Sequence, residues 1–348
     1  MNIESNSRRS SSERKIGYVG RDNPIELILA AGAIPVGIHG VPGRETPRAD
    51  RYVEPTFSPE SRAIAEQWLR GELDMLEAVI FSRSDDSAQR LYYYFCELQR
   101  RGLCGGPKPL LYDIANWNRD SSLAHTIAST RHRARELCAS ADALPRAIER
   151  VRERCELLAS ASEFTLEPQS ARGSFTQRLV RLADRDWSEH FDPTLRTMRD
   201  PSPASPETTR LILIGSTPGD ECLHEAAEGA GANIIATLNA ATPHRTPSCA
   251  STGDAFERIA RRCRAHSWRN KLQSPDDFCE RAIELDVAGV ILWTVSEDAS
   301  LAWAAPRIEG ALRARGIAVL PLTMQPWNVS AGALNAVAAF AAKLRSST

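Results

Sequence analysis

The chain has 348 residues, of which 42% are hydrophobic and 25% are charged, and its formal net charge is −1. This composition is typical of a globular protein, and the length predicts two domains at about 100–200 residues each. The balanced charge excludes binding to nucleic acid or to a membrane surface through a general basic field. No apolar run in the sequence approaches the roughly 18 residues of a membrane-spanning helix.

The eight cysteines are irregularly spaced, and none forms a C-x-x-C pair. Zinc modules need closely spaced ligand pairs, so we expect no metal site built from these thiols. No secretory signal precedes them, which predicts reduced thiols in a cytoplasmic protein. Residues 1–14 are polar and rich in serine and arginine, and we expect them to form a disordered tail.

Short apolar runs alternate with helical patterns along the first half, which indicates an α/β fold. Asn23 can cap a helix that has Pro24 at its first position, and Glu26 stands where a capping box closes. Gly32 can end this helix in the left-handed conformation. The strands expected in this half are Ile16–Gly20, Ile34–Ile38, Ala78–Phe81 and Leu110–Ile114.

A proline-rich stretch at 201–209 is the predicted linker, because three prolines within six residues cannot continue a helix or a central strand. We therefore expect a first domain over residues 15–200, with a helical region at about 120–190, and a second domain over residues 210–348. Ser274 opens a later helix with a capping box that Asp277 closes. The strands expected in the second half are Arg210–Ile214, Asn233–Thr237, Gly289–Val295 and Ile317–Leu320.

These elements predict two open, mainly parallel sheets with helices on both faces. Ligands of such sheets sit beyond the carboxyl ends of the strands. Four loops therefore become candidate functional segments: Gly20–Pro24, Ser82–Ser87, Gly215–Asp220 and Ser296–Ala299.

The same loops carry a resemblance to a known family. The segments are IGYVGRDNPIELILAAGAIPVGIHG, LEAVIFSRSDDSAQRLYYYFCEL, RLILIGSTPGDECLHEAAEGAGANIIA and DVAGVILWTVSEDASLAW. As a set, over roughly residues 15 to 345, they resemble the D-component family of 2-hydroxyacyl-CoA dehydratases and benzoyl-CoA reductases. The resemblance implies two Rossmann-like domains facing a central cleft, where three cysteines of the family hold a [4Fe-4S] cluster.

The chain departs from the family pattern at the cluster ligands. The positions that the resemblance implies are occupied by Ser58, with Thr56 as the alternative, and by Asp85 and Glu297. Iron–sulfur clusters need thiolate ligands, and two carboxylates with a hydroxyl do not replace them. We therefore expect this chain to bind no cluster and no other cofactor. A [4Fe-4S] cluster on a partner subunit is what the family implies.

Three carboxylates are candidate catalytic groups, namely Asp85, Glu297 and Glu26. Burial beside a second carboxylate could raise one pKa enough for general-base chemistry on a thioester. The structural alternatives are that Asp85 or Asp86 caps a helix and that Glu26 only closes a capping box. A hard cation between Asp85 and Glu297 is the less favoured alternative.

Substrate contacts are expected from both domains. The turn at Ser216–Asp220 opens a helix whose N-terminus can hold a CoA phosphate, although a simple tight turn explains it equally well. Arg90 can bind a phosphate or a partner carboxylate, or cover the surface of its helix. The predicted substrate-binding residues are Asp86, Ser87, Gln89, Arg90, Ser216, Thr217, Gly219 and Asp220.

The leading hypothesis is a subunit of a dehydratase-like lyase or aryl-CoA reductase complex that binds no cluster itself. It would shape an acyl-CoA cleft and dock a homologous, cluster-bearing subunit in a heterodimer or larger assembly. The family also implies an ATP-dependent activator and a CoA thioester as substrate. The alternatives are a cluster-free acid–base enzyme and a regulatory protein that binds acyl-CoA.

Overall fold

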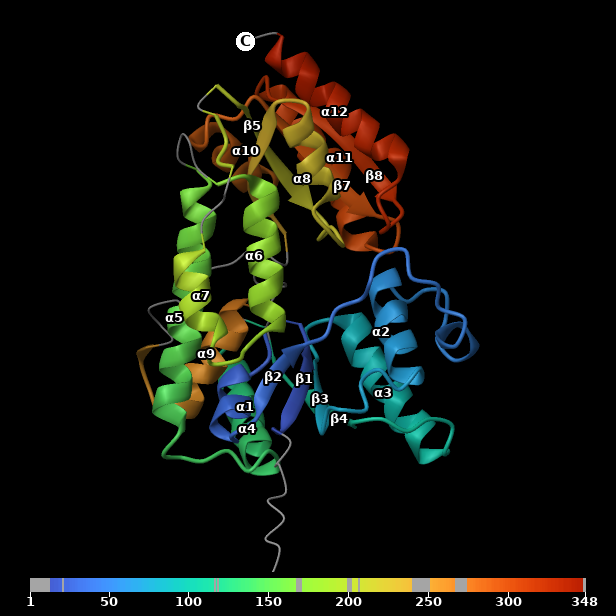
Figure 1. Ribbon diagram of the computed structural model, residues 1–348, viewed down its shortest axis with the longest axis vertical. Helices are drawn as coiled ribbons and strands as arrows, with labels where there is room; N and C mark the ends of the chain where they lie inside the picture. Colours follow the sequence, from blue (N-terminus) through green and yellow to red (C-terminus); the bar gives the residue numbers. More distant parts are fainter. Residues whose placement is uncertain are drawn as a thin grey trace, which may run out of the picture.

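The computed structural model describes residues 13–20, 22–115, 117, 119–166, 171–198, 202–205, 207–239, 251–266 and 274–346. Their strands form two parallel four-stranded sheets, one in each of two lobes (Figure 1). The first sheet contains β1 (Lys15–Val19), β2 (Ile34–Gly37), β3 (Ala78–Ser82) and β4 (Lys108–Tyr112). The second contains β5 (Thr209–Gly215), β6 (Ala232–Leu238), β7 (Gly289–Val295) and β8 (Ala318–Gln325).

The strands form where the sequence has continuous apolar runs. Every residue of β3 and of β7 is buried, as expected for strands covered by helices on both faces of a parallel sheet. The strand order is β2-β1-β3-β4 in one sheet and β6-β5-β7-β8 in the other, so the two lobes repeat one topology. The predicted fold class and all eight predicted strands are confirmed, with shifts at the strand ends.

Helices cover both sheets. The first lobe has α1 (Ile25–Ala30), α2 (Pro59–Leu69), α3 (Asp86–Arg100) and α4 (Asp120–Glu136), with a short 3-10 helix, η1 (Ala49–Arg51). The second has α8 (Cys222–Gly229), α10 (Pro275–Glu284), α11 (Ala299–Ala314) and α12 (Ala331–Arg345). The predicted helical region contains α5 (Leu144–Phe164), α6 (Gly173–Arg185) and α7 (Phe191–Thr197). In the part of the chain described, no helix is long and apolar enough to cross a membrane.

Helix α9 (Ala255–His266) belongs to the first lobe, although its sequence lies within the segment expected to form the second domain. Ile259 and Cys263 are part of the apolar core beneath the first sheet. Arg262 of α9 forms a buried ion pair with Glu26 of α1. Figure 1 shows α9, in orange, in the same lobe as α1 and α4. The proposed boundary at 201–209 therefore lies between two sheets but does not separate all of their helices.

Helix α6 connects the two lobes, with each end fixed by the backbone of a different sheet (Figure 1). A Cβ on Gly37 of β2 would lie 2.4 Å from the carbonyl oxygen of Asp184, near the end of α6. A Cβ on Gly173 would lie 2.2 Å from the carbonyl oxygen of Ile234, in β6. Glycine at both positions lets α6 approach both sheets closely.

One predicted helix cap is wrong. Helix α1 has no side-chain cap, and the Asn23 amide donates instead to the carbonyls of Val19 (2.6 Å) and Gly20 (2.9 Å). Glu26 does not close a capping box because both of its oxygens bind Arg262. Local sequence could not reveal a partner 236 residues away.

The capping box between Ser274 and Asp277 is confirmed, with bonds of 3.2 Å and 2.7 Å between each side chain and the other residue's amide. Gly32 follows α1 with a φ of 68°, the predicted left-handed conformation. Both features depend on local sequence alone.

Candidate functional site

The crevice of each sheet lies where the strand order reverses, between β1 and β3 and between β5 and β7. The four loops chosen from the sequence follow these four strands. The loop after β2 of the first lobe meets the loop after β5 of the second, because a Cβ on Gly219 would lie 2.5 Å from Pro42. The carboxyl edges of the two sheets therefore face each other at this point.

A serine–aspartate hydrogen bond crosses each crevice. In the first lobe, Ser84 donates to the carboxylate of Asp22. In the second, the Ser216 hydroxyl donates to Asp298 Oδ2 at 3.2 Å and accepts from the amide of Val295 at 3.1 Å. Ser216, predicted to contact substrate, thus joins the ends of β5 and β7.

The three positions implied to have lost cluster ligands lie at or next to helix N-caps. Ser58 caps α2 by accepting from the amide of Ser61 at 3.2 Å. Asp85 caps α3 by accepting from the amide of Ala88 at 2.6 Å. Glu297 directly precedes Asp298, which caps α11. These hydroxyl and carboxylate groups do not fit an iron–sulfur cluster, whose irons need thiolate or occasionally imidazole ligands.

Asp85 lies in an acidic environment. The side chain of Asp85 is exposed, yet the surrounding protein displaces much of the water near its carboxylate. This desolvation is the main cause that raises the pKa of Asp85 from 3.8 to about 6. The negative charges of Glu60, Asp22 and Asp86 act in the same direction, whereas the bond from the Ala88 amide opposes them. Asp85 can therefore exchange a proton near neutral pH.

The other two predicted catalytic carboxylates lie in different surroundings. Glu297 is exposed and accepts a hydrogen bond from the Ser296 hydroxyl at 3.0 Å. Glu26 is buried, and Arg262 donates to its oxygens at 2.5 Å and 2.8 Å. Glu26 therefore fastens α1 to α9, and its predicted catalytic role stays a prediction.

A cation between Asp85 and Glu297 stays a prediction. Across the residues that the structure describes, no three His, Cys, Asp or Glu side chains are arranged to hold a metal ion.

The predicted contacts on α3 are partly occupied by the protein itself. Arg90 donates to Glu54 at 2.7 Å, and its guanidinium lies 4.0 Å from the centre of the Phe57 ring. Arg90 thus binds the segment before α2, and its role towards a phosphate or a partner carboxylate stays a prediction. Asp86, Ser87 and Gln89 lie in the first turn of α3, beside the capping residue Asp85.

The Ser216–Asp220 turn is also engaged in packing. Arg181 of α6 donates to the Gly219 carbonyl and pairs with Glu221. Asp220 accepts from the amide of Cys222 at 3.1 Å, and Thr217 is half-buried. Two carboxylates at the start of α8 weaken the attraction of this helix end for a phosphate.

His39, just after β2 at the carboxyl edge of the first sheet, is a residue for which the sequence predicted no role. Its Nε2 lies 2.6 Å from Asp184 Oδ2, and its Nδ1 lies 3.8 Å from Glu60 Oε1. Burial lowers the pKa of His39, but its contacts with the negative charges of Asp184 and Glu60 outweigh burial and raise the pKa to about 9. The useful signal was the position of His39 after a predicted strand.

The chain matches a known protein family. The family model described as 2-hydroxyglutaryl-CoA dehydratase, D-component, matches residues 22–340. No curated protein matches the chain significantly.

Proposed function

Because the chain belongs to the 2-hydroxyglutaryl-CoA dehydratase D-component family, we propose that it is a subunit of a dehydratase-like or aryl-CoA reductase-like complex that carries no cluster of its own. It shapes a cleft for an acyl-CoA and docks a homologous subunit that bears the [4Fe-4S] cluster. An ATP-dependent activator serves that partner.

The observation that carries this proposal is the capping at the implied ligand positions. Ser58 and Asp85 each bind the first turn of their own helix, as Asp298 does next to Glu297. A capping oxygen stabilises a helix by about 1 kcal/mol, so these loops keep their shape without a cofactor. Six described cysteines, Cys96, Cys104, Cys138, Cys222, Cys263 and Cys279, are free thiols, which fits the reducing cytoplasm.

Anaerobic reconstitution with iron and sulfide tests the cluster part of the proposal. The full-length chain is expected to stay colourless and bind no stoichiometric iron. The triple variant Ser58→Cys, Asp85→Cys, Glu297→Cys restores three thiolates and is expected to take up about four irons, since such clusters are thiolate-bound. A brown wild-type protein would contradict the proposal, and a colourless triple variant would contradict the assignment of the ligand positions.

Purification from the native host tests the partner. A tagged chain is expected to bring down a homologous subunit that contains iron. A chain that elutes alone, under anaerobic conditions and low salt, would contradict the proposed assembly.

A second candidate is a cluster-free enzyme that performs acid–base chemistry on a thioester. The raised pKa of Asp85, about 6, favours it. Turnover by the isolated chain that Asp85→Asn abolishes would support this candidate over the first. Binding of CoA esters without turnover, measured by calorimetry, would instead indicate a regulatory protein.

A further inference from the structure

We propose that His39 is the cationic hydrogen-bond donor of the cleft and that it binds the carbonyl oxygen of a CoA thioester. The inference rests on the proposed acyl-CoA cleft and assigns a contact residue to it. His39 follows β2 at the carboxyl edge of the first sheet, where ligands of such sheets bind.

The backbone around His39 is built for close approach from two sides. A Cβ on Gly37 would lie 2.4 Å from the carbonyl oxygen of Asp184, and a Cβ on Gly40 would lie 2.8 Å from the carbonyl oxygen of Glu60. Glycines on both sides thus bring the ends of α6 and α2 against this segment. Gln67 also donates to the His39 carbonyl at 2.8 Å. The backbone of His39 is therefore held in a fixed place.

Asp184, which fixes the ring, is itself fixed. Tyr18 Oη donates to the carbonyl of Asp184 at 2.6 Å and lies 3.2 Å from its Oδ1, and it accepts from Trp187 Nε1 at 2.9 Å. Arg154 lies 3.9 Å from the centre of the Trp187 ring. Each contact in this series restrains the next, from α5 to the cleft.

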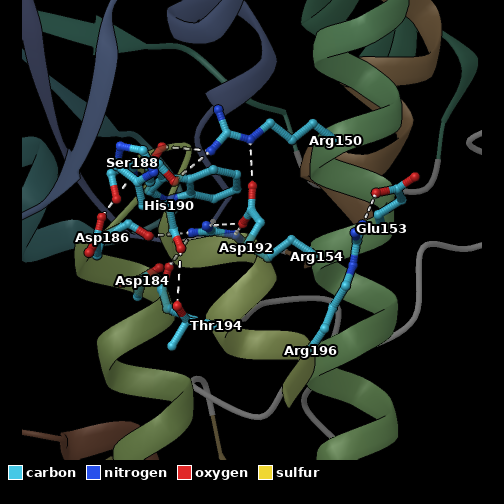
Figure 2. Close-up of polar contacts among 12 residues, drawn as sticks. Arg150, Glu153, Arg154, Asp184, Asp186, Ser188, His190, Asp192, Thr194 and Arg196 are labelled. Atoms are coloured by element: carbon cyan, nitrogen blue, oxygen red, sulfur yellow. Dashed lines mark hydrogen bonds and ion pairs between the residues drawn. The ribbon is translucent and has the colours of Figure 1, made fainter. Parts of the chain in front are cut away.

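Figure 2 shows the helical end of this series. Arg150 and Arg154 of α5 converge on Asp192 of α7, where Arg150 Nε lies 2.7 Å from Asp192 Oδ2. Arg154 also donates to the carbonyl of Ala183, next to Asp184, at 2.8 Å. The end of α6 that carries Asp184 is thus bound tightly to the helical region.

The second ring nitrogen of His39 makes only a long ion pair. Its Nδ1 lies 3.8 Å from Glu60 Oε1, beyond the roughly 3.2 Å limit of an ordinary hydrogen bond. The His39 side chain is 24% exposed. With Asp184 on Nε2, the ring is cationic at neutral pH because its pKa is raised to about 9. A thioester oxygen is the acceptor that such a donor stabilises when negative charge develops on it.

Two CoA compounds that differ only in the carbonyl group test this inference. Butyryl-CoA is the thioester, and S-butyl-CoA is the thioether in which a methylene replaces the carbonyl. The full-length chain, with any subunit that copurifies, is expected to bind the thioester about tenfold more tightly, as for a hydrogen bond to a charged group. His39→Gln should remove most of this preference, and His132→Gln, on an exposed side chain of α4, should keep it.

Titration of the His39 imidazole by NMR provides a readout that does not depend on affinity. In wild type the ring should titrate near pH 9, and in Asp184→Asn at a lower pH, because one of its two anionic neighbours is lost. The His39 signal should also shift on addition of butyryl-CoA and much less with S-butyl-CoA. Asp184 is a positioning residue. The Asp184→Asn variant therefore tests whether Asp184 holds the His39 ring in the folded protein.

The outcomes separate the two proposals. If neither compound binds the wild-type protein, the acyl-CoA cleft and the role of His39 fall together. If both bind equally, or if His39→Gln keeps the preference for the thioester, the cleft stands and the role of His39 is refuted.

Discussion

Two effects on the charge of the Asp85 carboxylate oppose each other. Its carboxylate caps α3, yet protein and three neighbouring carboxylates disfavour its charge. A folded-state pKa of about 6 lies above the ordinary 3.8, so the folded protein binds this proton more tightly than the unfolded chain does. The contribution of Asp85 to stability is therefore present at low pH and decreases as the pH rises from about 4 through 6.

Asp85→Asn tests this conflict because asparagine caps helices as well as aspartate does and carries no charge. The variant is expected to match wild type near pH 3.5 and to be more stable at pH 7. Chemical unfolding at several pH values measures the difference. Asp85→Ala is the control, since loss of the cap should cost about 1 kcal/mol even where Asp85 is protonated. Equal stability of wild type and Asp85→Asn at pH 7 would contradict the raised pKa.

For single residues, the sequence predicts those structural roles that depend only on neighbouring residues. The cap at Asp85 followed from its place before a helix, and the crevice loops followed from the ends of the strands. The partner of Glu26 could not be predicted, because Arg262 reaches it only through the tertiary fold. For His39, the position after a strand could be predicted from the sequence, but its carboxylate neighbours could not.

Among the elements, α6 sets the distance between the two sheets. Gly37→Ala would place a methyl group 2.4 Å from a backbone oxygen, and Gly173→Ala would place one 2.2 Å from another. The backbone cannot move aside as a flexible side chain can. Each variant is expected to lose about 1–3 kcal/mol of unfolding free energy, the typical cost of overpacking. Urea denaturation measures it.

Gly310→Ala is the matched control for these substitutions. Gly310 lies inside α11, and a Cβ there would meet no atom within 4 Å. This change should stabilise the protein by about 0.5–1 kcal/mol through helix propensity. Losses of the same size in all three variants would mean that glycine contacts do not fix α6.

The elements themselves were largely readable from the sequence. Buried strands such as β7 are continuous apolar runs, and helices such as α10 begin at recognisable caps. Helix α9 shows the limit. Its apolar face at Phe256, Ile259 and Cys263 has helical spacing, but that spacing cannot say which sheet the helix covers. The helix docks on the first lobe through contacts that only the folded chain brings together.

For the molecule as a whole, the buried pair between Glu26 and Arg262 fastens the second half of the chain to the first lobe. Their side chains are only 2% and 5% exposed, so Glu26→Gln leaves an uncompensated buried cation. Breaking such a pair is expected to cost about 3–5 kcal/mol. The exposed pair between Arg14 and Glu77 is the control, and Glu77→Gln should cost less than about 1 kcal/mol. Thermal or urea unfolding of the two variants distinguishes them.

The docking of α9 also has a consequence during translation. Residues 13–198 supply the whole first sheet, but Ile259 and Cys263 complete its apolar core. As the chain leaves the ribosome, the first lobe must therefore wait, with part of its core uncovered, until α9 has been synthesised. Stalled nascent chains that end before residue 255 should remain sensitive to protease throughout the first lobe, and chains long enough to expose α9 should become resistant.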